Sequence, residues 1–528
     1  MTIKRLLLGA LTILALFLVS ASLVQSWNQP QIQSRLELYQ TNLILHAAEW
    51  RGDSDQAAGV ENARKTLIGD DAFETALKQY QETRQSAQKS LETTQQQLEL
   101  AQTAAIPPAP KPPAPENPPV KTAVQSPQQL QASIDRLDKL IDELDLRIGV
   151  LQAHKAQTEA ALTTWTGIIE RSSNRPIAQP FVTTAGVLRE LWNSRILPDA
   201  EPQIQQNLDG WFRYQALSRL YELQESSNVL ATLQAEEQEV AQQAAIKLAI
   251  IGGIPTIGFF VGVGLLIFLL AQRVVKGKES LLAQHGELSW ETPWDAETIW
   301  QVLIVGFFFV GQIVVPLSLG LLNSALDINP ATLDVRSKAF YILASYVLLA
   351  SGGLLVIYLS VKPYLPLPES WFRFDWRGNW FLWGLGGYLV ALPLVVVVSL
   401  INQRLWQGQG GSNPILPIAL EGKDNVALAI FFLTASIGAP VFEELMFRGF
   451  LLPSLTRYVP VWGAIAASSL LFAIAHLNVS EVLPLATLGA VLGFIYTRSR
   501  NLLAPMLLHS LWNTGTLLSL FILGSGSK

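Results

Sequence analysis

The 528-residue chain carries 37 Lys and Arg against 42 Asp and Glu, and the resulting net charge of −5 gives no indication of nucleic-acid binding. Half of the residues are hydrophobic and only 15% are charged, and the mean hydropathy of +0.29 is high for a soluble protein. The absence of cysteine excludes thiol nucleophiles, cysteine-ligated zinc and disulfides.

The N-terminal segment, residues 1–26, joins two basic residues to an apolar run. Lys4 and Arg5 precede the run, which extends from about Leu6 to Val24. Its length is sufficient for a membrane span, and its charged start also resembles a signal peptide. We interpret it as an uncleaved anchor, and either reading places the following residues on the same side of the membrane.

Residues 27–246 form a polar insert without a spanning run, and we expect a soluble helical domain there. Two helical arms between residues 71 and 165 flank a proline-rich link at 104–120, where proline removes amide donors. We expect an antiparallel coiled-coil hairpin, with a parallel dimer through the second arm as the alternative, and residues 71–165 as the surface for a coiled-coil protein partner. The second arm has a heptad seam made by Ile134, Leu137, Ile141, Leu144, Ile148 and Leu151.

Apolar runs recur after residue 247 and predict an all-α, polytopic membrane protein with about nine spans, the N-terminal run included. We divide this region into accessory helices at 247–379 and a core at 380–528. Basic residues gather in alternate loops, so the positive-inside bias predicts a cytoplasmic N-terminus and a non-cytoplasmic insert. The later runs lie near 248–271, 299–323, 339–361, 380–402, 425–452, 461–478, 481–497 and 501–523.

The stretch GAPVFEELMFRGF places ionisable side chains inside an apolar run, where an unpaired charge is costly. Glu444 and Arg448 are four residues apart, share one helix face and are expected to pair. Glu443 points about 100° away from Glu444 and has no such partner on its own helix. We therefore interpret Glu444 and Arg448 as supporting residues, and Glu443 as free to act as a general base.

Two further apolar stretches carry histidine. LLFAIAHLN places His476 one turn after Phe472, and MLLHSLWNTG places His509 four residues before Asn513 on one helix side. Each of these residues alone is commonly a packing or hydrogen-bonding residue. The chain has only five histidines, however, and two of them lie in these segments near an unpaired glutamate. The joint pattern indicates a catalytic site that consists of Glu443, His476, His509 and Asn513.

The three stretches together resemble the motif set of the CPBP intramembrane proteases, a family of CAAX proteases and bacteriocin-processing (Abi) proteins. EExxxR, FxxxH and HxxxN occur in the family's order without a departure, and the resemblance covers about residues 380–523. It implies an intramembrane endopeptidase that hydrolyses a peptide bond of a membrane-associated peptide or protein. By this resemblance Glu443 and His476 would activate the attacking water, and His509 and Asn513 would stabilise the oxyanion. The matching positions are Glu443, Glu444, Arg448, Phe472, His476, His509 and Asn513.

No cofactor is favoured, since the zinc-binding HExxH pattern is absent. Glu443, His476 and His509 would nevertheless suit three ligands of a catalytic zinc ion with one open position, so a metal-dependent protease stays an alternative. Two functions of other classes also stay open. One is a transporter subunit with a buried proton relay, and the other is a non-catalytic membrane scaffold whose insert recruits partners.

Straight helices would place the candidate residues at unequal depths. A helix that starts at Asn425 would carry Glu443 about 27 Å from the outer surface. His509 would lie about 12 Å from the inner surface and His476 about 22 Å, at 1.5 Å of rise per residue. A common site therefore requires breaks or kinks, for which Pro440 is the candidate.

Overall fold

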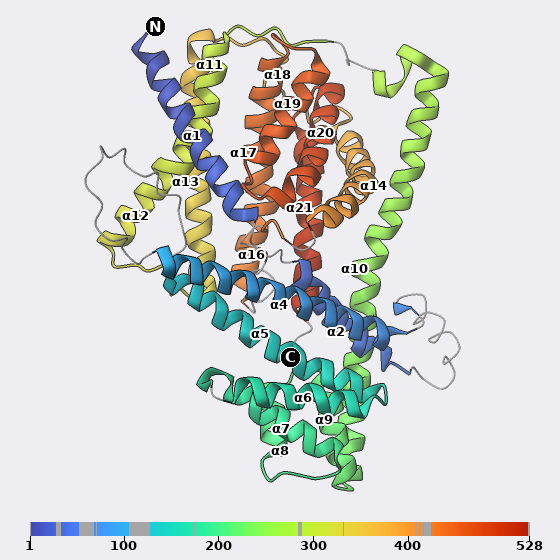
Figure 1. Ribbon diagram of the computed structural model, residues 1–528. Coiled ribbons are helices and arrows are strands. Elements are labelled where there is room, and N and C mark those ends of the chain that lie inside the picture. The colour runs from blue at the N-terminus through green and yellow to red at the C-terminus, as the bar shows by residue number, and fades with distance from the viewer. Residues whose placement is uncertain are drawn as a thin grey trace, which may run out of the picture. The chain divides into compact units, whose positions relative to one another are not determined.

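The structure is a computed structural model, and it describes residues 2–27, 33–51, 68–69, 71–104, 127–173, 175–283, 288–330, 332–406, 409–412, 416 and 424–525. Nearly all of the proline-rich link at 104–120 lies outside these residues. The described residues contain helices and no β-strand, which confirms the all-α prediction (Figure 1). The described residues divide into two compact units, those within 1–33 and 250–525 (unit 1) and those within 34–249 (unit 2).

Unit 1 is a bundle of long apolar helices with short helical turns at several connections. Its elements are α1 (Ile3–Trp27), the later part of α10 (Ser227–Lys276), η2 (Gly277–Glu279), η3 (Leu281–Ala283), α11 (Ala296–Gln301), η4 (Val302–Val314), α12 (Val315–Ala325), α13 (Val335–Val361), η5 (Lys362–Tyr364), α14 (Trp380–Trp406), α16 (Asn425–Leu433), η6 (Thr434–Gly438), α17 (Ala439–Glu444), η7 (Leu445–Leu451), α18 (Leu452–Leu455), α19 (Val461–Ile474), η8 (Val479–Glu481), α20 (Val482–Ser499) and α21 (Leu503–Gly524). η4, η6 and η7 are π-helical segments within longer helices.

Eight helices among the described residues are long and apolar enough to cross a membrane, and the protein is an integral, multi-pass membrane protein. The remaining predicted run, 461–478, contains α19, which has only 14 residues. Such a helix is about 21 Å long, shorter than the hydrocarbon core of about 30 Å. The run at 481–497, the shortest in the sequence, belongs instead to a 21-residue helical segment of sufficient length.

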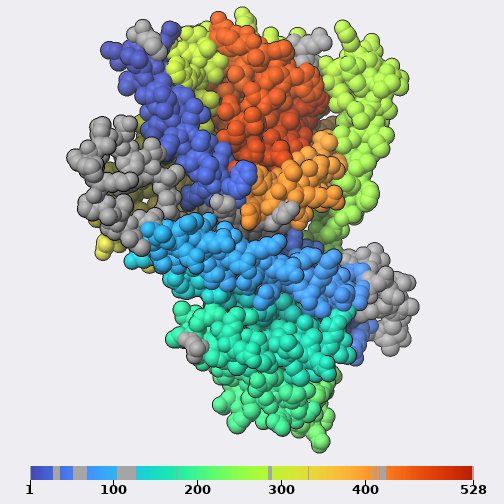
Figure 2. Space-filling view, viewed as in Figure 1, coloured from blue at the N-terminus to red at the C-terminus, as the bar shows by residue number. Residues whose placement is uncertain are grey.

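The N-terminal helix α1 is a packed part of unit 1 and crosses one of its faces (Figure 2). Its Ala15 and Val19 are buried against Ile304 and Phe308 of η4. Two polar contacts add to this packing: the Trp300 indole donates to the Thr12 hydroxyl at 2.8 Å, and the Val479 amide donates to the Ser26 hydroxyl at 3.2 Å.

One end of unit 1 collects basic residues from connections that are distant in sequence. Lys4 and Arg5 both pair with Glu297, at 3.0 and 2.7 Å. The segment before α11 accepts hydrogen bonds on its carbonyl oxygens from three arginines of later connections. The basic residues involved are Lys4, Arg5, Arg457, Arg498 and Arg500.

Unit 2 is a helical domain with a core of aromatic and aliphatic side chains. Trp165 and Trp211 are fully buried at its centre. Its elements are α2 (Gln33–Ala48), α4 (Ala72–Ala104), α5 (Pro127–His154), α6 (Thr158–Ser172), η1 (Pro176–Ala178), α7 (Gln179–Trp192), α8 (Ala200–Asn207), α9 (Gly210–Leu223) and the first part of α10.

The two predicted arms, α4 and α5, pack against each other along their length in antiparallel orientation (Figure 1). The order of their ion pairs demonstrates the orientation: Asp71 pairs with Lys155 at 3.3 Å, and Arg84 pairs with Asp145 at 3.0 Å. Ala87 and Leu91 of α4 are buried with Ile134 and Ile141 of the heptad seam. A supercoiled coiled coil, and a partner for it, stay predictions.

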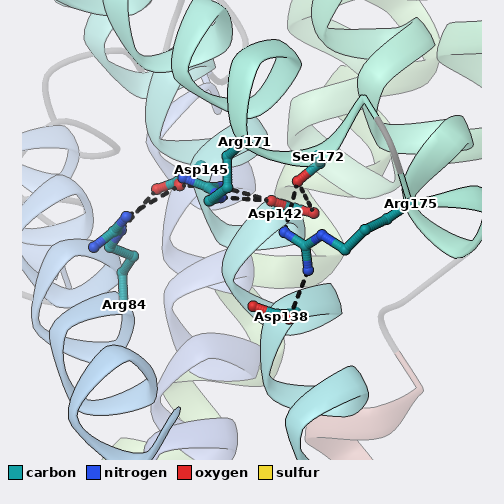
Figure 3. Close-up of polar contacts among 7 residues, drawn as sticks. All are labelled: Arg84, Asp138, Asp142, Asp145, Arg171, Ser172 and Arg175. Atoms are coloured by element: carbon teal, nitrogen blue, oxygen red, sulfur yellow. Dashed lines mark hydrogen bonds and ion pairs between the residues drawn. The ribbon is translucent and has the colours of Figure 1, made fainter. Parts of the chain in front are cut away.

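A buried charge network joins α4, α5 and α6 (Figure 3). Asp142 is fully buried and accepts hydrogen bonds from Arg171 at 2.6 Å and from Ser172 at 2.8 Å. Arg171 also donates to Asp145 at 2.8 Å. Because buried charges are costly unless paired, this network couples the three helices to one register.

Candidate active site

An ion pair lies at the centre of unit 1. Arg448 donates from Nη1 to Glu444 Oε1 at 2.9 Å, and both side chains have 0% exposure. Nη2 of Arg448 donates to the Gly489 carbonyl at 3.0 Å, and its guanidinium lies 4.6 Å from the centre of the Phe472 ring. The pair expected from the i, i+4 spacing is therefore formed, and it joins η7 to α19 and α20.

His509 of α21 lies between the two adjacent glutamates. Its Nδ1 is 2.9 Å from Glu444 Oε1, the oxygen that also accepts from Arg448. Its Nε2 faces Glu443 Oε2 at 3.9 Å. Since a carboxylate only accepts, Nδ1 carries the hydrogen, and the orientation of the imidazole is determined by Glu444.

Glu443 occupies the more open side of the cluster. Its side chain is 18% exposed, while Glu444 beside it is fully buried. Oε2 of Glu443 is itself buried and has no hydrogen-bond partner among the described residues. The distance of 3.9 Å to His509 is too long for a hydrogen bond. Glu443 therefore presents an uncommitted carboxylate oxygen to the imidazole.

His476 lies in the turn that follows α19. Its Nδ1 is 2.9 Å from the Phe472 carbonyl, so this nitrogen donates and Nε2 has the lone pair. The Phe472 ring lies 5.0 Å from the His476 ring and 5.7 Å from the His509 ring. Phe472 thus separates the two histidines and makes edge contacts with both.

Asn513 lies one turn after His509 on α21. Its amide nitrogen donates to the Ala435 carbonyl in η6 at 2.7 Å. The amide thereby ties α21 to the π-helical segment that precedes Glu443, next to the buried Ser436.

The segment that contains these candidate residues is similar to known proteins. Residues 425–515 match the model of the type II CAAX prenyl endopeptidase Rce1-like family. The chain is 26% identical over 140 residues to a protein named provisionally as the membrane peptidase YdiL, from Bacillus subtilis (strain 168). It is 27% identical over 137 residues to the membrane-embedded CAAX protease MroQ, from Staphylococcus aureus (strain USA300). Residues 425–515 are thus similar to the CPBP intramembrane proteases, and this segment is called the CPBP domain below.

The CPBP domain is one part of a longer chain. The alignments cover 26% and 25% of this chain, and 56% and 54% of the two relatives, so the chain spans about half the length of the curated relatives it matches. The family match begins at residue 425, later than the 380 expected from the motifs. No solved structure matches the chain.

In the CPBP domain His509 lies beside both Glu443 and Glu444, despite the unequal depths expected for straight helices. α19 ends at Ile474, and the chain turns at once, with Leu477 in the left-handed region at φ +60°. The helix that starts at Asn425 contains the π-helical segments η6 and η7, which widen its turns around Glu443. A short helix and a widened one thus replace the two straight helices assumed from the sequence.

Two features around the candidate site leave no signal in the sequence. One is the contact between Glu444 and His509, because residues 65 positions apart share no spacing signal. The other is Tyr346 of α13, whose hydroxyl is buried beside Glu443. A tyrosine in an apolar run is ordinary by composition, so only the packing of α13 identifies it.

A metal at this site would require Glu443, His476 and His509 to converge. Among the described residues no group of three His, Asp or Glu side chains is placed as a set of metal ligands. Nδ1 of each histidine is engaged, by Glu444 and by the Phe472 carbonyl, and Nε2 of each stays available, as is usual for histidines that ligate metals. The three side chains do not form a ligand set in this arrangement, and a metal-dependent protease stays the alternative.

Proposed function

We propose that this chain is an intramembrane endopeptidase that hydrolyses a peptide bond of a membrane-associated peptide or protein. The observation that carries the proposal is the gap of 3.9 Å between Glu443 Oε2 and His509 Nε2. Glu443, the general base, and His509, the hydrogen-bond donor, face each other across this gap. Glu444 orients the imidazole through its contact with Nδ1. An attacking water and a substrate carbonyl require groups of these two kinds.

Charge balance assigns the protonation of the cluster. Glu443 and Glu444 contribute two negative charges, and Arg448 contributes one positive charge. A protonated His509 brings the sum to zero, which is the favourable state for buried and mutually paired groups. The imidazolium then donates from Nδ1 to Glu444 and from Nε2 toward the gap.

The reaction follows from these assignments. Glu443 accepts a proton from water, and the hydroxide oxygen forms a bond to the scissile carbonyl carbon. The carbonyl oxygen becomes an oxyanion and accepts a hydrogen bond from His509 Nε2. The carbon–nitrogen bond then breaks, and the proton held by Glu443 passes to the leaving amine, so that one water is consumed per peptide bond.

His476 and Asn513 have supporting places in the proposal. His476 Nε2 is a second proton acceptor near Phe472, which agrees with the family role of assisting water activation. Asn513 would contribute to the oxyanion site if its amide exchanged the Ala435 carbonyl for the substrate, and otherwise it positions α21.

The orientation belongs to the same proposal. The basic residues Lys4, Arg5, Arg457, Arg498 and Arg500 gather at one end of unit 1, and we place that end at the cytoplasmic surface. The insert, residues 27–246, then lies on the non-cytoplasmic side.

The test is peptide cleavage by the purified full-length protein in detergent, with a quenched-fluorescence peptide library and a prenylated C-terminal peptide as separate arms. Glu443→Gln should lower kcat by about 10²- to 10⁴-fold. The matched control is Glu369→Gln, because Glu369 is an exposed glutamate outside the site, and this variant should cleave as wild type does. Each protein is assayed with and without a zinc chelator.

The outcomes separate the alternatives. Loss of cleavage in Glu443→Gln, with no effect of chelator, supports the glutamate-activated water. Cleavage that is lost with chelator and restored by zinc replaces it with a metal-dependent protease. A Glu443→Gln variant as active as wild type rejects the role of Glu443, and a wild type inactive in every arm favours a scaffold or a transporter subunit.

A further inference from the structure

The histidine that would assist water activation lies in a turn that its own residues do not favour. The His476 turn, residues 475–480, follows α19, and Leu477 in this turn has φ +60°. The left-handed conformation suits glycine and is strained for leucine, so it persists where surrounding groups hold it. Inside the turn, the Asn478 side-chain amide donates to the His476 carbonyl at 3.1 Å. Further support comes from segments that are distant in sequence.

The C-terminal end of α1 contacts the His476 turn. Ser26 is buried, and its hydroxyl accepts a hydrogen bond from the Val479 amide at 3.2 Å. The same hydroxyl donates to the Leu23 carbonyl at 2.9 Å, which leaves its lone pairs for the Val479 amide. Leu23 packs into the apolar cluster that also contains Ile474 and Leu477. α1 therefore meets the chain both before and after the histidine.

The C-terminal end of α14 holds the last residue of the same turn. The Asn402 side-chain amide donates to the Ser480 carbonyl at 2.6 Å, and the Ser480 hydroxyl donates to the Gly411 carbonyl at 2.7 Å. The Trp406 indole donates to the Asn402 amide oxygen at 3.1 Å, and the Trp406 ring lies 4.9 Å from the Trp27 ring of α1. The ends of α1 and α14 thus contact each other and the His476 turn. Both helices lie outside the family match at 425–515.

The imidazole of His476 depends on this support because its own contacts are local. Nδ1 donates to the Phe472 carbonyl, and the Phe472 ring lies edge-on to the imidazole. Both contacts are made to α19, one turn earlier, and neither restrains the backbone after the histidine. A displacement of a reacting group by about 1 Å can lower a rate by about 100-fold, so the position of the turn matters for catalysis.

We propose that Ser26 is a positioning residue for His476, so that the catalytic unit of the protease includes α1. The Ser26 hydroxyl fixes the Val479 amide, which follows His476 by three residues. A helix that served only as a membrane anchor would need its apolar surface alone, with no buried hydroxyl bonded to a turn of the candidate site. The proposal rests on the function proposed above, in which His476 Nε2 accepts a proton.

The first test measures kcat and KM of Ser26→Ala on the library peptide that wild type cleaves best. Loss of the hydroxyl should lower kcat by about 10-fold with KM within about twofold, because the proton acceptor shifts while the substrate contacts stay. The thermal unfolding midpoint should fall by less than about 4 °C. Ser20→Ala is the matched control, since Ser20 is an exposed serine on the same helix, and it should behave as wild type does.

A double-mutant cycle with His476 separates positioning from a general loss of structure. Ser26→Ala should have no further effect on kcat in a His476→Ala protein, because the group that Ser26 positions is gone. An equal fold-loss in both backgrounds overturns the role of Ser26, and so does a wild-type kcat in Ser26→Ala.

Amide hydrogen–deuterium exchange of the peptide that contains Val479 provides a measurement independent of activity. Exchange over residues 476–479 should be faster in Ser26→Ala than in wild type or Ser20→Ala, and unchanged exchange overturns the inference. If Glu443→Gln is inactive and Ser26→Ala is unimpaired, the proposed function stands and this inference fails. If Glu443→Gln is as active as wild type, the proposed mechanism fails, and the exchange result alone decides whether Ser26 holds the turn.

Discussion

Glu444 Oε1 accepts from two nitrogen donors: Arg448 Nη1 and His509 Nδ1 each lie 2.9 Å from it. One carboxylate oxygen therefore connects α17, η7 and α21. The adjacent glutamates consequently have different tasks, because Glu444 Oε1 is committed to these two partners while Glu443 only approaches His509, at 3.9 Å.

The shared oxygen predicts a separation of stability from activity. Glu444→Leu leaves the buried Arg448 without its charge partner and should destabilise the protein by about 3–5 kcal/mol. The double variant Glu444→Leu with Arg448→Met should recover most of this loss, since an apolar pair of similar volume replaces the ion pair. Thermal unfolding in detergent measures both.

Cleavage should not recover in the same double variant, because His509 lacks the acceptor that holds Nδ1. A double variant with wild-type kcat would contradict the assignment of Glu444 as the residue that orients His509. A double variant no more stable than the single one would contradict the charge-pair explanation.

Gly149 in α5 should not tolerate a methyl group. Its Cβ would lie 2.2 Å from Trp165 Nε1, and Trp165 is fully buried. Gly149→Ala should therefore lower the thermal midpoint of unit 2, although alanine favours a helix by about 1 kcal/mol. Gly186 in α7 is the control, since a Cβ there meets nothing within 4 Å, and Gly186→Ala should stabilise the unit. Equal shifts of the same sign would exclude the steric explanation.

The network in Figure 3 predicts a selective loss in unit 2. Asp142→Ala removes the acceptor of Arg171 and Ser172 in a fully buried position and should destabilise by about 2–4 kcal/mol. Asp135→Ala, at an exposed position about two turns earlier on α5, should change stability by less than about 0.5 kcal/mol. Thermal unfolding followed by circular dichroism compares the two, and similar losses would argue against a structural role for the network.

Asp424 predicts a pH-dependent contribution at the start of α16. The Ala427 amide donates to its carboxylate, and Arg336 pairs with it at 2.9 Å, so the pKa of Asp424 lies below its usual range. A lowered carboxyl pKa contributes stability above the unfolded-state pKa of about 3.9, and this is lost as pH falls through the folded pKa. Asp424→Asn keeps a capping oxygen but cannot titrate.

Wild type should therefore have the higher thermal midpoint at pH 7, and the difference from Asp424→Asn should disappear as the pH falls below 3.9. A difference that stays constant over this interval would show that the charge of Asp424 contributes nothing.

The candidate residues and the helical class were readable from the sequence because both depend on local patterns. Apolar runs of about 20 residues predict spans without reference to their neighbours, and the i, i+4 spacing of Glu444 and Arg448 predicts a pair on one helix. The motif order located the protease domain, which the family match at 425–515 supports.

The tertiary structure decided which of these residues meet. Helix spacing carries no information about the 65-residue separation of Glu444 and His509, and a hydropathy run does not reveal that α19 ends at Ile474 or that π-helical turns surround Glu443. Ser26 and Val479, which are 453 residues apart, meet only because α1 packs against the bundle. Such contacts are set by packing between helices, and packing depends on the whole bundle, whereas periodicity depends only on neighbouring residues.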